Sequence, residues 1–156
     1  MQAKLINYYK KFSFFILLPF FLSFNVLASD FVSVKVKKAI LFDGPSEATK
    51  KKLIITEGYP LLVLVTLKEW LKVKDHKGKI SWIKKNDTSS ERTVMTLRLG
   101  VPIYKKASSS SNRVADVEDS VALKLSSTLV TDGWANVKSE LNDLSGFVSA
   151  NDIWGI

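Results

Sequence analysis

Apolar and polar residues alternate with a period of two in several short segments of the chain. In residues 31–37, three valines alternate with serine and lysine, and residues 70–74 and 134–138 each begin with tryptophan and then alternate in the same way. A period of two sends successive side chains to opposite faces of an extended strand, whereas an amphipathic helix needs a period near 3.6. These segments are therefore predicted to be strands with one buried face.

One apolar segment lacks this alternation. The leucine and valine run from Leu61 to Leu67 is continuous, which fits a strand covered on both faces or a short helix. Its β-branched content, its length and the preceding Gly58 and Pro60 favour a strand. Residues 75–78, DHKG, are predicted to form a turn, because aspartate bonds back to its own backbone and glycine adopts positive φ.

The same order of features occurs twice along the chain. The matched positions are Ile54 with Ala115, Leu62 with Leu123, Trp70 with Trp134, and 81–83 with 146–148. The offset between the copies grows from 61 to 65, and it grows only in the turn-rich segments 126–133 and 139–146. Insertions confined to turns are expected when two copies share one fold. Short strands, frequent turns and the lack of helical periodicity then predict an all-β chain of two small antiparallel barrels.

The N-terminal region has the composition of an export signal. Three lysines without an acid precede an uncharged apolar run, and the small residue Ala28 fits a cleavage site. We therefore predict a signal peptide at 1–28, a first domain at 29–87 and a second domain at 88–156. The alternative is an uncleaved membrane anchor, since the uncharged span of 18 residues lies at the lower limit for a spanning helix. Either reading predicts an exported protein, periplasmic or otherwise in the cell envelope.

Composition narrows the possible chemistry. The chain has no cysteine, which excludes a disulfide framework, a thiolate metal site and a cysteine nucleophile. Residues 30–87 contain 13 lysines and 7 acids, net +6, whereas residues 88–156 contain 7 basic residues and 8 acids, net −1. This asymmetry suggests an anionic neighbour for the first half. A lysine-rich surface that only keeps an exported protein soluble is the other reading.

Several motifs resemble the bacterial SH3-like domain family. The residues that carry the resemblance are Gly-Pro-Ser at 44–46, Gly58 before an apolar strand, Trp70 three residues before Val73, and GKISWI at 78–83. The chain looks most like exported proteobacterial proteins with two such domains after a signal sequence and a short Trp-Gly-aliphatic tail, as in IWGI at 153–156. The resemblance implies two tandem small SH3-like antiparallel β-barrels and a binding role in the envelope.

The second copy departs from the pattern of the first. Phe147 replaces the tryptophan that Trp82 supplies, and Lys106 with Ala107 replaces Gly-Pro. In the first copy Ser81 stands where glycine is usual in the family. These differences favour the first copy if one of the two has kept a ligand groove.

The first copy contains the candidate binding residues. A tryptophan among lysines can stack on a planar or sugar group while the ammonium groups hold an anion. The candidate ligand-binding residues are Phe42, Tyr59, Trp70, Lys72, Lys74 and Trp82. The other reading is that each tryptophan packs at the end of a barrel, and the recurrence of the tryptophan as Trp134 in the acidic second copy supports it. Tyr59 and Tyr104, the second-copy counterpart of Phe42, are the better candidates for a groove, because a phenol tolerates a half-wet rim.

No feature of the sequence indicates catalysis. His76 is the only histidine and lies in the predicted turn without a carboxylate or cysteine cluster, so we expect an exposed turn residue rather than a metal ligand or general base. We predict a non-enzyme without cofactor or metal that recognises a cell-wall peptide or an envelope protein segment. Nucleic acid is not an expected partner, and membrane contact is expected only through an uncleaved signal segment. The alternative is a structural or regulatory partner of an envelope protein complex, with no small-molecule ligand.

Overall fold

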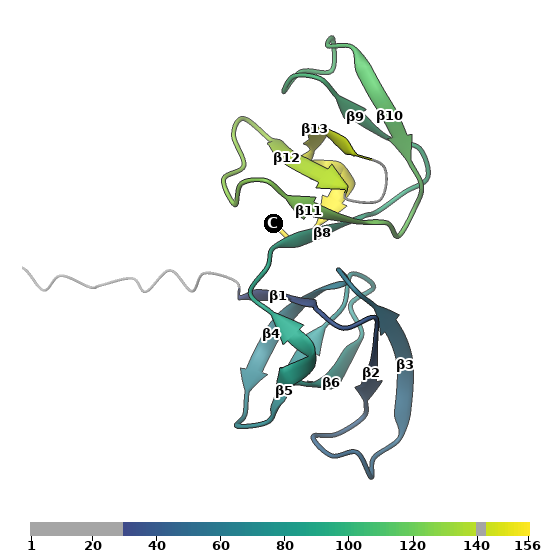
Figure 1. Ribbon diagram of the computed structural model, residues 1–156, viewed down its shortest axis with the longest axis vertical. Helices are drawn as coiled ribbons and strands as arrows, with labels where there is room; N and C mark the ends of the chain where they lie inside the picture. The colour runs from purple at the N-terminus through teal and green to yellow at the C-terminus, as the bar shows by residue number, and fades with distance from the viewer. Residues whose placement is uncertain (1–29, 140–142) are drawn as a thin grey trace, which may run out of the picture.

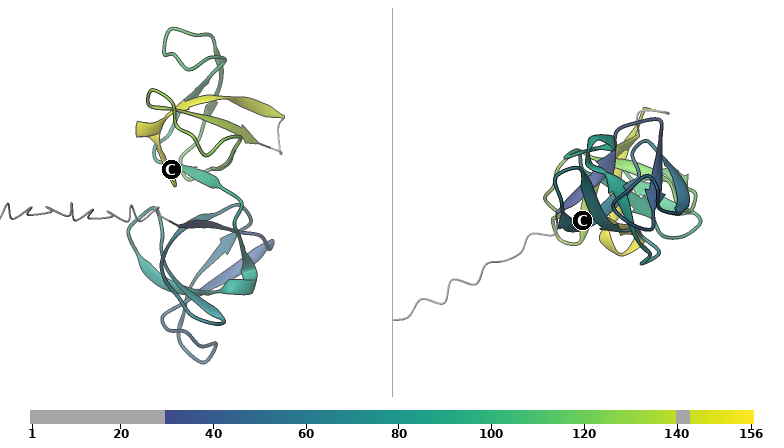
Figure 2. Two further views of the ribbon diagram at one scale, coloured as in Figure 1. Left: turned by 90° about the vertical axis from the view of Figure 1, so that its left-hand side faces the viewer. Right: turned by 90° about the horizontal axis from the view of Figure 1, so that it is seen from below.

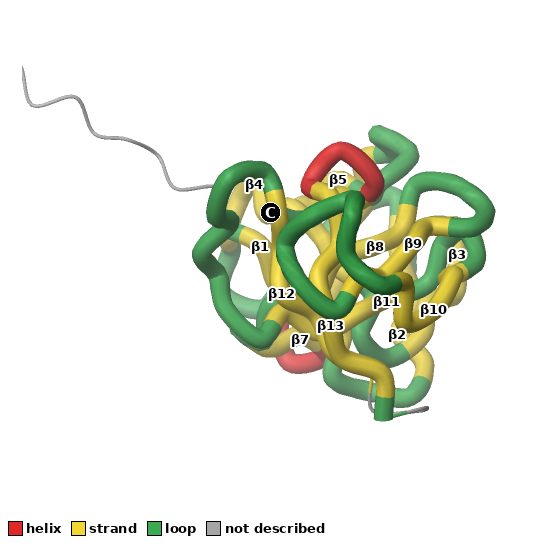
Figure 3. The backbone as a smooth tube through the Cα atoms, turned by 90° about the horizontal axis from the view of Figure 1, so that it is seen from above, coloured by secondary structure: helices red, strands yellow, loops and turns green. Residues whose placement is uncertain are grey.

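The structure is a computed structural model that describes residues 30–139 and 143–156. The predicted signal segment at 1–28 lies outside the described residues. Strands dominate the described chain, and two single-turn 3₁₀ helices, η1 (Lys85–Asp87) and η2 (Ala150–Asp152), interrupt them (Figure 3). Within the described ranges, no helix has the length and apolar character needed to cross a membrane.

Seven antiparallel strands form the first sheet. They are β1 (Phe31–Val34), β2 (Lys38–Phe42), β3 (Lys51–Thr56), β4 (Pro60–Thr66), β5 (Trp70–Lys74), β6 (Ile80–Lys84) and β7 (Thr88–Ser89). Their order in the sheet is β3-β2-β6-β5-β4-β1-β7. The sheet therefore ends at Ser89, two residues beyond the domain boundary that we placed after Asp87, and this boundary remains a prediction.

Seven further strands form the second sheet. They are β8 (Thr93–Thr96), β9 (Val101–Tyr104), β10 (Arg113–Val117), β11 (Ala122–Leu125), β12 (Trp134–Ser139), β13 (Leu144–Ser149) and β14 (Ile153–Trp154). The order β10-β9-β13-β12-β11-β8-β14 repeats that of the first sheet with every label raised by seven. The predicted all-β class is confirmed, and the two sheets are consistent with two SH3-like β domains.

Each sheet curls around its own apolar core, because inward-facing residues alternate along its strands. In the first core the most deeply buried residues are Leu61 and Ile83, both 0% exposed. In the second core Val101, Ile103 and Val148 are equally buried. The predicted strand at 61–67 is confirmed as β4, but its expected burial on both faces is wrong. A bulge between Val63 and Val65 turns the end of β4 outward, so that Val65 is 43% exposed.

Backbone hydrogen bonds correct the alignment of the two copies by one residue. Val34 N–H donates to the Tyr59 carbonyl at 3.1 Å, and Thr96 N–H donates to the Val121 carbonyl at 3.0 Å. Leu61 lies opposite Val32 in the sheet, and Leu123 lies opposite Val94. The offset in this region is therefore 62 rather than 61, and Tyr59 corresponds to Val121. Positive φ at Gly58 and at Ser120 marks the same turn in both copies.

The two sheets stack along the long axis of the molecule, and the chain crosses between them at residues 90–92 (Figures 1 and 2). Arg92 lies at this seam, where its Nη2 donates to the Gly155 carbonyl at 2.8 Å. Its guanidinium also lies 5.2 Å from the centre of the Phe31 ring, which meets Trp154 edge to face at 5.0 Å. The C-terminal Trp-Gly segment therefore packs against the first strand of the chain.

Candidate binding surface

Strand register places five of the six predicted site residues on one outer face of the first sheet. Trp82 on β6 lies opposite Lys72 on β5 and opposite Phe42 on β2. Trp70 and Lys74 lie two residues on either side of Lys72 and thus share its face. Alternation predicted the shared face of β5, and the pairing of β2 with β6 adds Phe42 to it. We call Phe42, Trp70, Lys72, Lys74 and Trp82 the aromatic-lysine face.

The aromatic residues of this face pack against one another. Phe42 is only 2% exposed and meets Trp70 edge to face, with 5.3 Å between ring centres and an angle of 90°. This geometry is favoured by the ring quadrupoles and fixes the indole in one orientation. Trp70 and Trp82 are half-buried. The two tryptophans therefore present ring surface to a partner, while Phe42 supports Trp70 from within.

Lysines supply the charge of the face. The Lys72 ammonium lies 6.0 Å from the centre of the Trp82 ring, at the outer range of a cation–π contact. Lys84 is opposite Trp70 and forms an ion pair with Glu47, whose hydrogen bond raises the pKa of Lys84. Among the described residues no carboxylate pairs with Lys72 or Lys74. These two ammonium groups are therefore the ones placed to meet an anion.

Tyr59 does not lie with the other predicted site residues. It packs against the first core near the β5–β6 turn, whereas Trp70 begins β5 at the opposite end of that strand. Its hydroxyl shares a 2.8 Å hydrogen bond with Nδ1 of His76. Burial, together with the nearby Asp75 carboxylate, raises the pKa of Tyr59 to about 12. Tyr59 therefore packs against the end of the first core and is not a member of the aromatic-lysine face.

The predicted turn at 75–78 is confirmed, but the expectation that His76 would be exposed is wrong. Asp75 Oδ1 accepts from the backbone N–H groups of Lys77 and Lys79, and Gly78 has a φ of 78°. His76 is half-buried because its hydrogen bond with Tyr59 holds it beside the core. Its Nε2 is buried and has no hydrogen-bond partner among the described residues. This burial lowers the pKa of His76, although Asp75 and Asp119 oppose the effect.

The second sheet repeats the aromatic packing without the same charge. Tyr104 meets Trp134 edge to face at 5.5 Å and 88°, and Phe147 lies opposite Tyr104. The residue opposite Phe147 is Asn136, where the first sheet has Lys72 opposite Trp82. The edge-to-face pair is thus common to both copies, and its recurrence indicates a packing role. Lys72 distinguishes the first face chemically.

The structure also contains a feature that the sequence reasoning missed. A cavity of about 580 Å³ opens into the second sheet between β10, β11 and β13. Alignment of Tyr59 with Val121, where a large ring is replaced by a small side chain, would have indicated it. The described residues contain no group of three or more histidine, aspartate or glutamate side chains that could hold a metal ion.

One family model matches part of the chain. Residues 35–90 match the family model of the bacterial SH3 domain, which supports a bacterial SH3-like domain in the first sheet. No curated protein matches the chain.

The chain also matches several solved structures at low identity. They are NlpC2 and NlpC1 from Trichomonas vaginalis, at 10% and 11% identity, and an NlpC/P60 family protein from Bacillus cereus, at 13%. The matches cover 80–81% of this chain, each with a TM-score of 0.37. They cover 48%, 45% and 55% of those proteins, so the chain spans about half of their length.

Proposed function

We propose that this protein is a non-catalytic, exported binding module of the bacterial cell envelope. Its ligand is an anionic peptide segment, from the cell wall or from an envelope protein, and the aromatic-lysine face binds it. The match of residues 35–90 to the bacterial SH3 domain supports a binding role for the first sheet. The lysine excess of residues 30–87 supports an anionic ligand.

One observation carries this proposal. Lys72 lies over Trp82 on a face where Phe42 holds Trp70 in a fixed orientation. A peptide lying across β5 and β6 would place apolar groups on the half-buried indoles and carboxylates against Lys72 and Lys74. Aromatic side chains lose little conformational entropy on binding, and the ammonium groups of Lys72 and Lys74 orient the ligand through its carboxylates.

Retention on purified peptidoglycan tests the proposal. Charge reversal at both Lys72→Glu and Lys74→Glu should reduce retention at least about tenfold, because it replaces two attractive contacts with two repulsive ones. Trp70→Ala should reduce retention as well, since it removes the exposed indole. The measurement is a sedimentation assay over a range of peptidoglycan concentrations at two salt concentrations, and added salt should weaken binding of the unaltered protein.

The second sheet supplies matched controls. Lys138 occupies the place of Lys74 in the second copy, and Trp134 occupies that of Trp70. Lys138→Glu should leave retention unchanged, and Trp134→Ala measures the cost of losing an edge-to-face pair away from the lysines. If the Lys72→Glu/Lys74→Glu protein and the Lys138→Glu protein are retained equally, the aromatic-lysine face does not bind peptidoglycan.

A second candidate function rests on the free edge of the first sheet. Strand β3 ends the strand order and exposes 46% of Leu53 and 63% of Ile54. An exposed apolar edge strand can pair with a strand from another protein. The chain would then be a structural or regulatory partner in an envelope complex, without a small-molecule ligand. Cross-linking in the intact envelope through a photoreactive group at Ile54 should then capture one protein in stoichiometric amount, and labelling without such a product argues against this function.

A further inference from the structure

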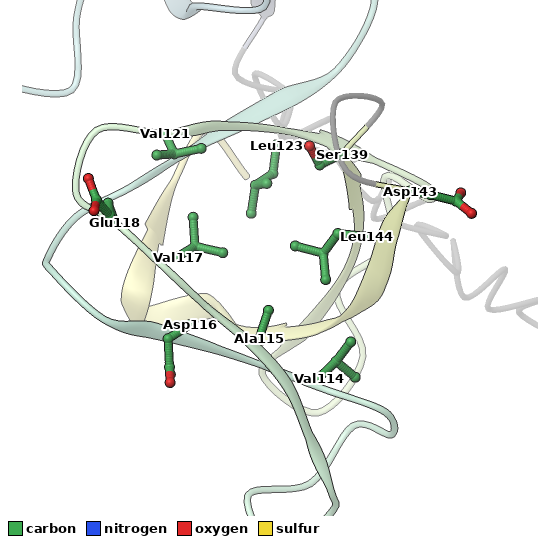
Figure 4. Close-up of a pocket in the computed structure, with 10 residues that line it drawn as sticks. All are labelled: Val114, Ala115, Asp116, Val117, Glu118, Val121, Leu123, Ser139, Asp143 and Leu144. Atoms are coloured by element: carbon green, nitrogen blue, oxygen red, sulfur yellow. The ribbon is translucent and has the colours of Figure 1, made fainter.

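The cavity in the second sheet has an apolar interior. Figure 4 shows Ala115, Val117, Val121, Leu123 and Leu144 projecting into the ring formed by the strands. Val117 and Leu123 belong to the second core and are 9% and 1% exposed, and Val121 and Leu144 are packed against that core. The cavity is therefore an opening into the core itself and not a fold between surface loops.

The first sheet shows what fills the equivalent space. Tyr59 corresponds to Val121, and it is flanked by Leu61, the counterpart of Leu123. The phenol ring of Tyr59 packs on the first core, and its hydroxyl reaches His76 in the β5–β6 turn. In the second sheet a valine replaces this ring, and no histidine follows β12. Among the described residues of the second copy, no aromatic ring therefore takes the place that Tyr59 occupies in the first.

The rim of the cavity is acidic. Asp116, Glu118 and Asp143 surround its mouth, and Figure 4 shows their carboxylates directed away from the apolar interior. Asp116 pairs with Arg113 at 3.2 Å. Within residues 30–139 and 143–156 no cation forms an ion pair with Glu118 or Asp143. A ligand that places an apolar group inside would thus meet two uncompensated carboxylates at the mouth.

We propose that this cavity binds an aromatic side chain, tyrosine or phenylalanine, of a partner peptide in which lysine or arginine flanks the aromatic residue. The ring takes the place that Tyr59 occupies in the first sheet, and the basic neighbours pair with Glu118 and Asp143. The site is separate from the aromatic-lysine face and takes ligands of the opposite charge. It would let one chain engage a basic segment through the second sheet, whatever the first sheet binds.

Titration of the exported chain, residues 29–156, with acetyl-Lys-Tyr-Lys-amide tests this proposal. Methyl resonances of Val117, Val121, Leu123 and Leu144 should shift in a saturable way, because an aromatic ring alters the shielding of nearby methyl groups. Acetyl-Glu-Tyr-Glu-amide has the same ring with acidic neighbours and should bind about tenfold more weakly or not at all. Acetyl-Lys-Ala-Lys-amide should not shift the cavity methyls.

Two variants separate the cavity from the rim. Val121→Tyr places in the second sheet the ring that the first sheet already has, and it should abolish the shifts at Leu123 and Leu144. Glu118→Gln with Asp143→Asn leaves the core unchanged and should weaken binding of the basic peptide about two- to fivefold for each charge removed. The double variant decides the matter if Val121→Tyr does not keep the wild-type spectrum.

The proposal is overturned by any of three results. These are cavity methyls that do not respond to the basic tyrosine peptide, equal binding of the basic and acidic peptides, and unchanged binding in a folded Val121→Tyr protein. Loss of peptidoglycan retention in the Lys72 and Lys74 variants bears only on the aromatic-lysine face, so the two proposals fail separately.

Discussion

At the residue scale, the pair formed by Tyr59 and His76 shows how burial changes a residue's role. Sequence alone placed the tyrosine at a half-wet binding rim and the histidine in an exposed turn. Contact between them could not be foreseen, since it depends on the β5–β6 turn folding back toward the end of the core. The hydrogen bond of 2.8 Å and the burial of Nε2 remove both residues from the candidate ligand surface.

The raised pKa of Tyr59 predicts a loss of stability in alkali. The unfolded state ionises near the ordinary tyrosine pKa of 10, whereas the folded state ionises at about 12. The contribution of the buried, un-ionised Tyr59 to folding stability is thus complete below pH 10 and is lost as the pH rises toward 12. The free energy of unfolding should fall more steeply over this interval in the unaltered protein than in Tyr59→Phe, measured by urea denaturation at each pH. Equal slopes in the two proteins would contradict the burial of this phenol.

The lowered pKa of His76 predicts a second pH dependence, in acid. Because the folded state binds a proton less readily than the unfolded state, stability should decrease as the pH falls below about 6.5. His76→Phe should remove that part of the decrease between about pH 7 and 5, where few carboxylates titrate. The same denaturation series measures it, and a His76→Phe protein that loses stability as steeply as the unaltered one would contradict the prediction.

At the element scale, the period of two correctly predicted the strands around Trp70 and Trp134, and turn chemistry predicted the hairpin at 75–78. Near Tyr59 the sequence pattern indicated an offset of 61 between the copies, where the structure has 62. The pattern of apolar residues did not show this difference, because it does not reveal where a turn takes positive φ. Ser33 was expected on a solvated face but is 1% exposed, since its hydroxyl donates to the Glu91 carbonyl at the seam. The alternation of apolar and polar residues shows which residues share a face of a strand. It does not show whether another part of the chain covers that face.

A close approach between β9 and β13 makes Gly146 necessary. A Cβ at this position would lie 2.6 Å from the Tyr104 carbonyl oxygen and 2.7 Å from a methyl carbon of Ile103. Gly146→Ala should therefore lower the free energy of unfolding by about 1–3 kcal/mol through overpacking. Ser145→Ala, at the exposed neighbouring position, is the control and should change it by less than about 0.5 kcal/mol. Equal stability of the two variants would refute the close approach.

At the scale of the whole molecule, the two sheets are joined by a small set of contacts around Arg92. Its guanidinium joins the Gly155 carbonyl of the second sheet to the Phe31 ring of the first. Nothing in the sequence distinguished this arginine, because its partners lie about sixty residues away on either side.

Removal of this arginine should loosen the seam. Arg92→Ala loses a hydrogen bond from a charged donor, a contact that contributes about 1.5–3 kcal/mol, and should broaden thermal unfolding or split it into two transitions. Arg113→Ala, which removes an exposed surface ion pair, is the matched control and should leave the calorimetric profile unchanged. A single sharp transition at the original temperature in Arg92→Ala would show that the seam does not depend on this side chain.

The first sheet is proposed to bind an anionic envelope peptide through the indoles of Trp70 and Trp82 and the ammonium groups of Lys72 and Lys74. Nuclear magnetic resonance titration of residues 29–156 with soluble peptidoglycan fragments tests it most directly. The indole N–H signals of Trp70 and Trp82 and the backbone signals of Lys72 and Lys74 should shift with a common affinity, while that of Trp134 stays unchanged. Shifts confined to the second sheet, or shifts that persist with the same affinity in Lys72→Glu/Lys74→Glu, would contradict the account.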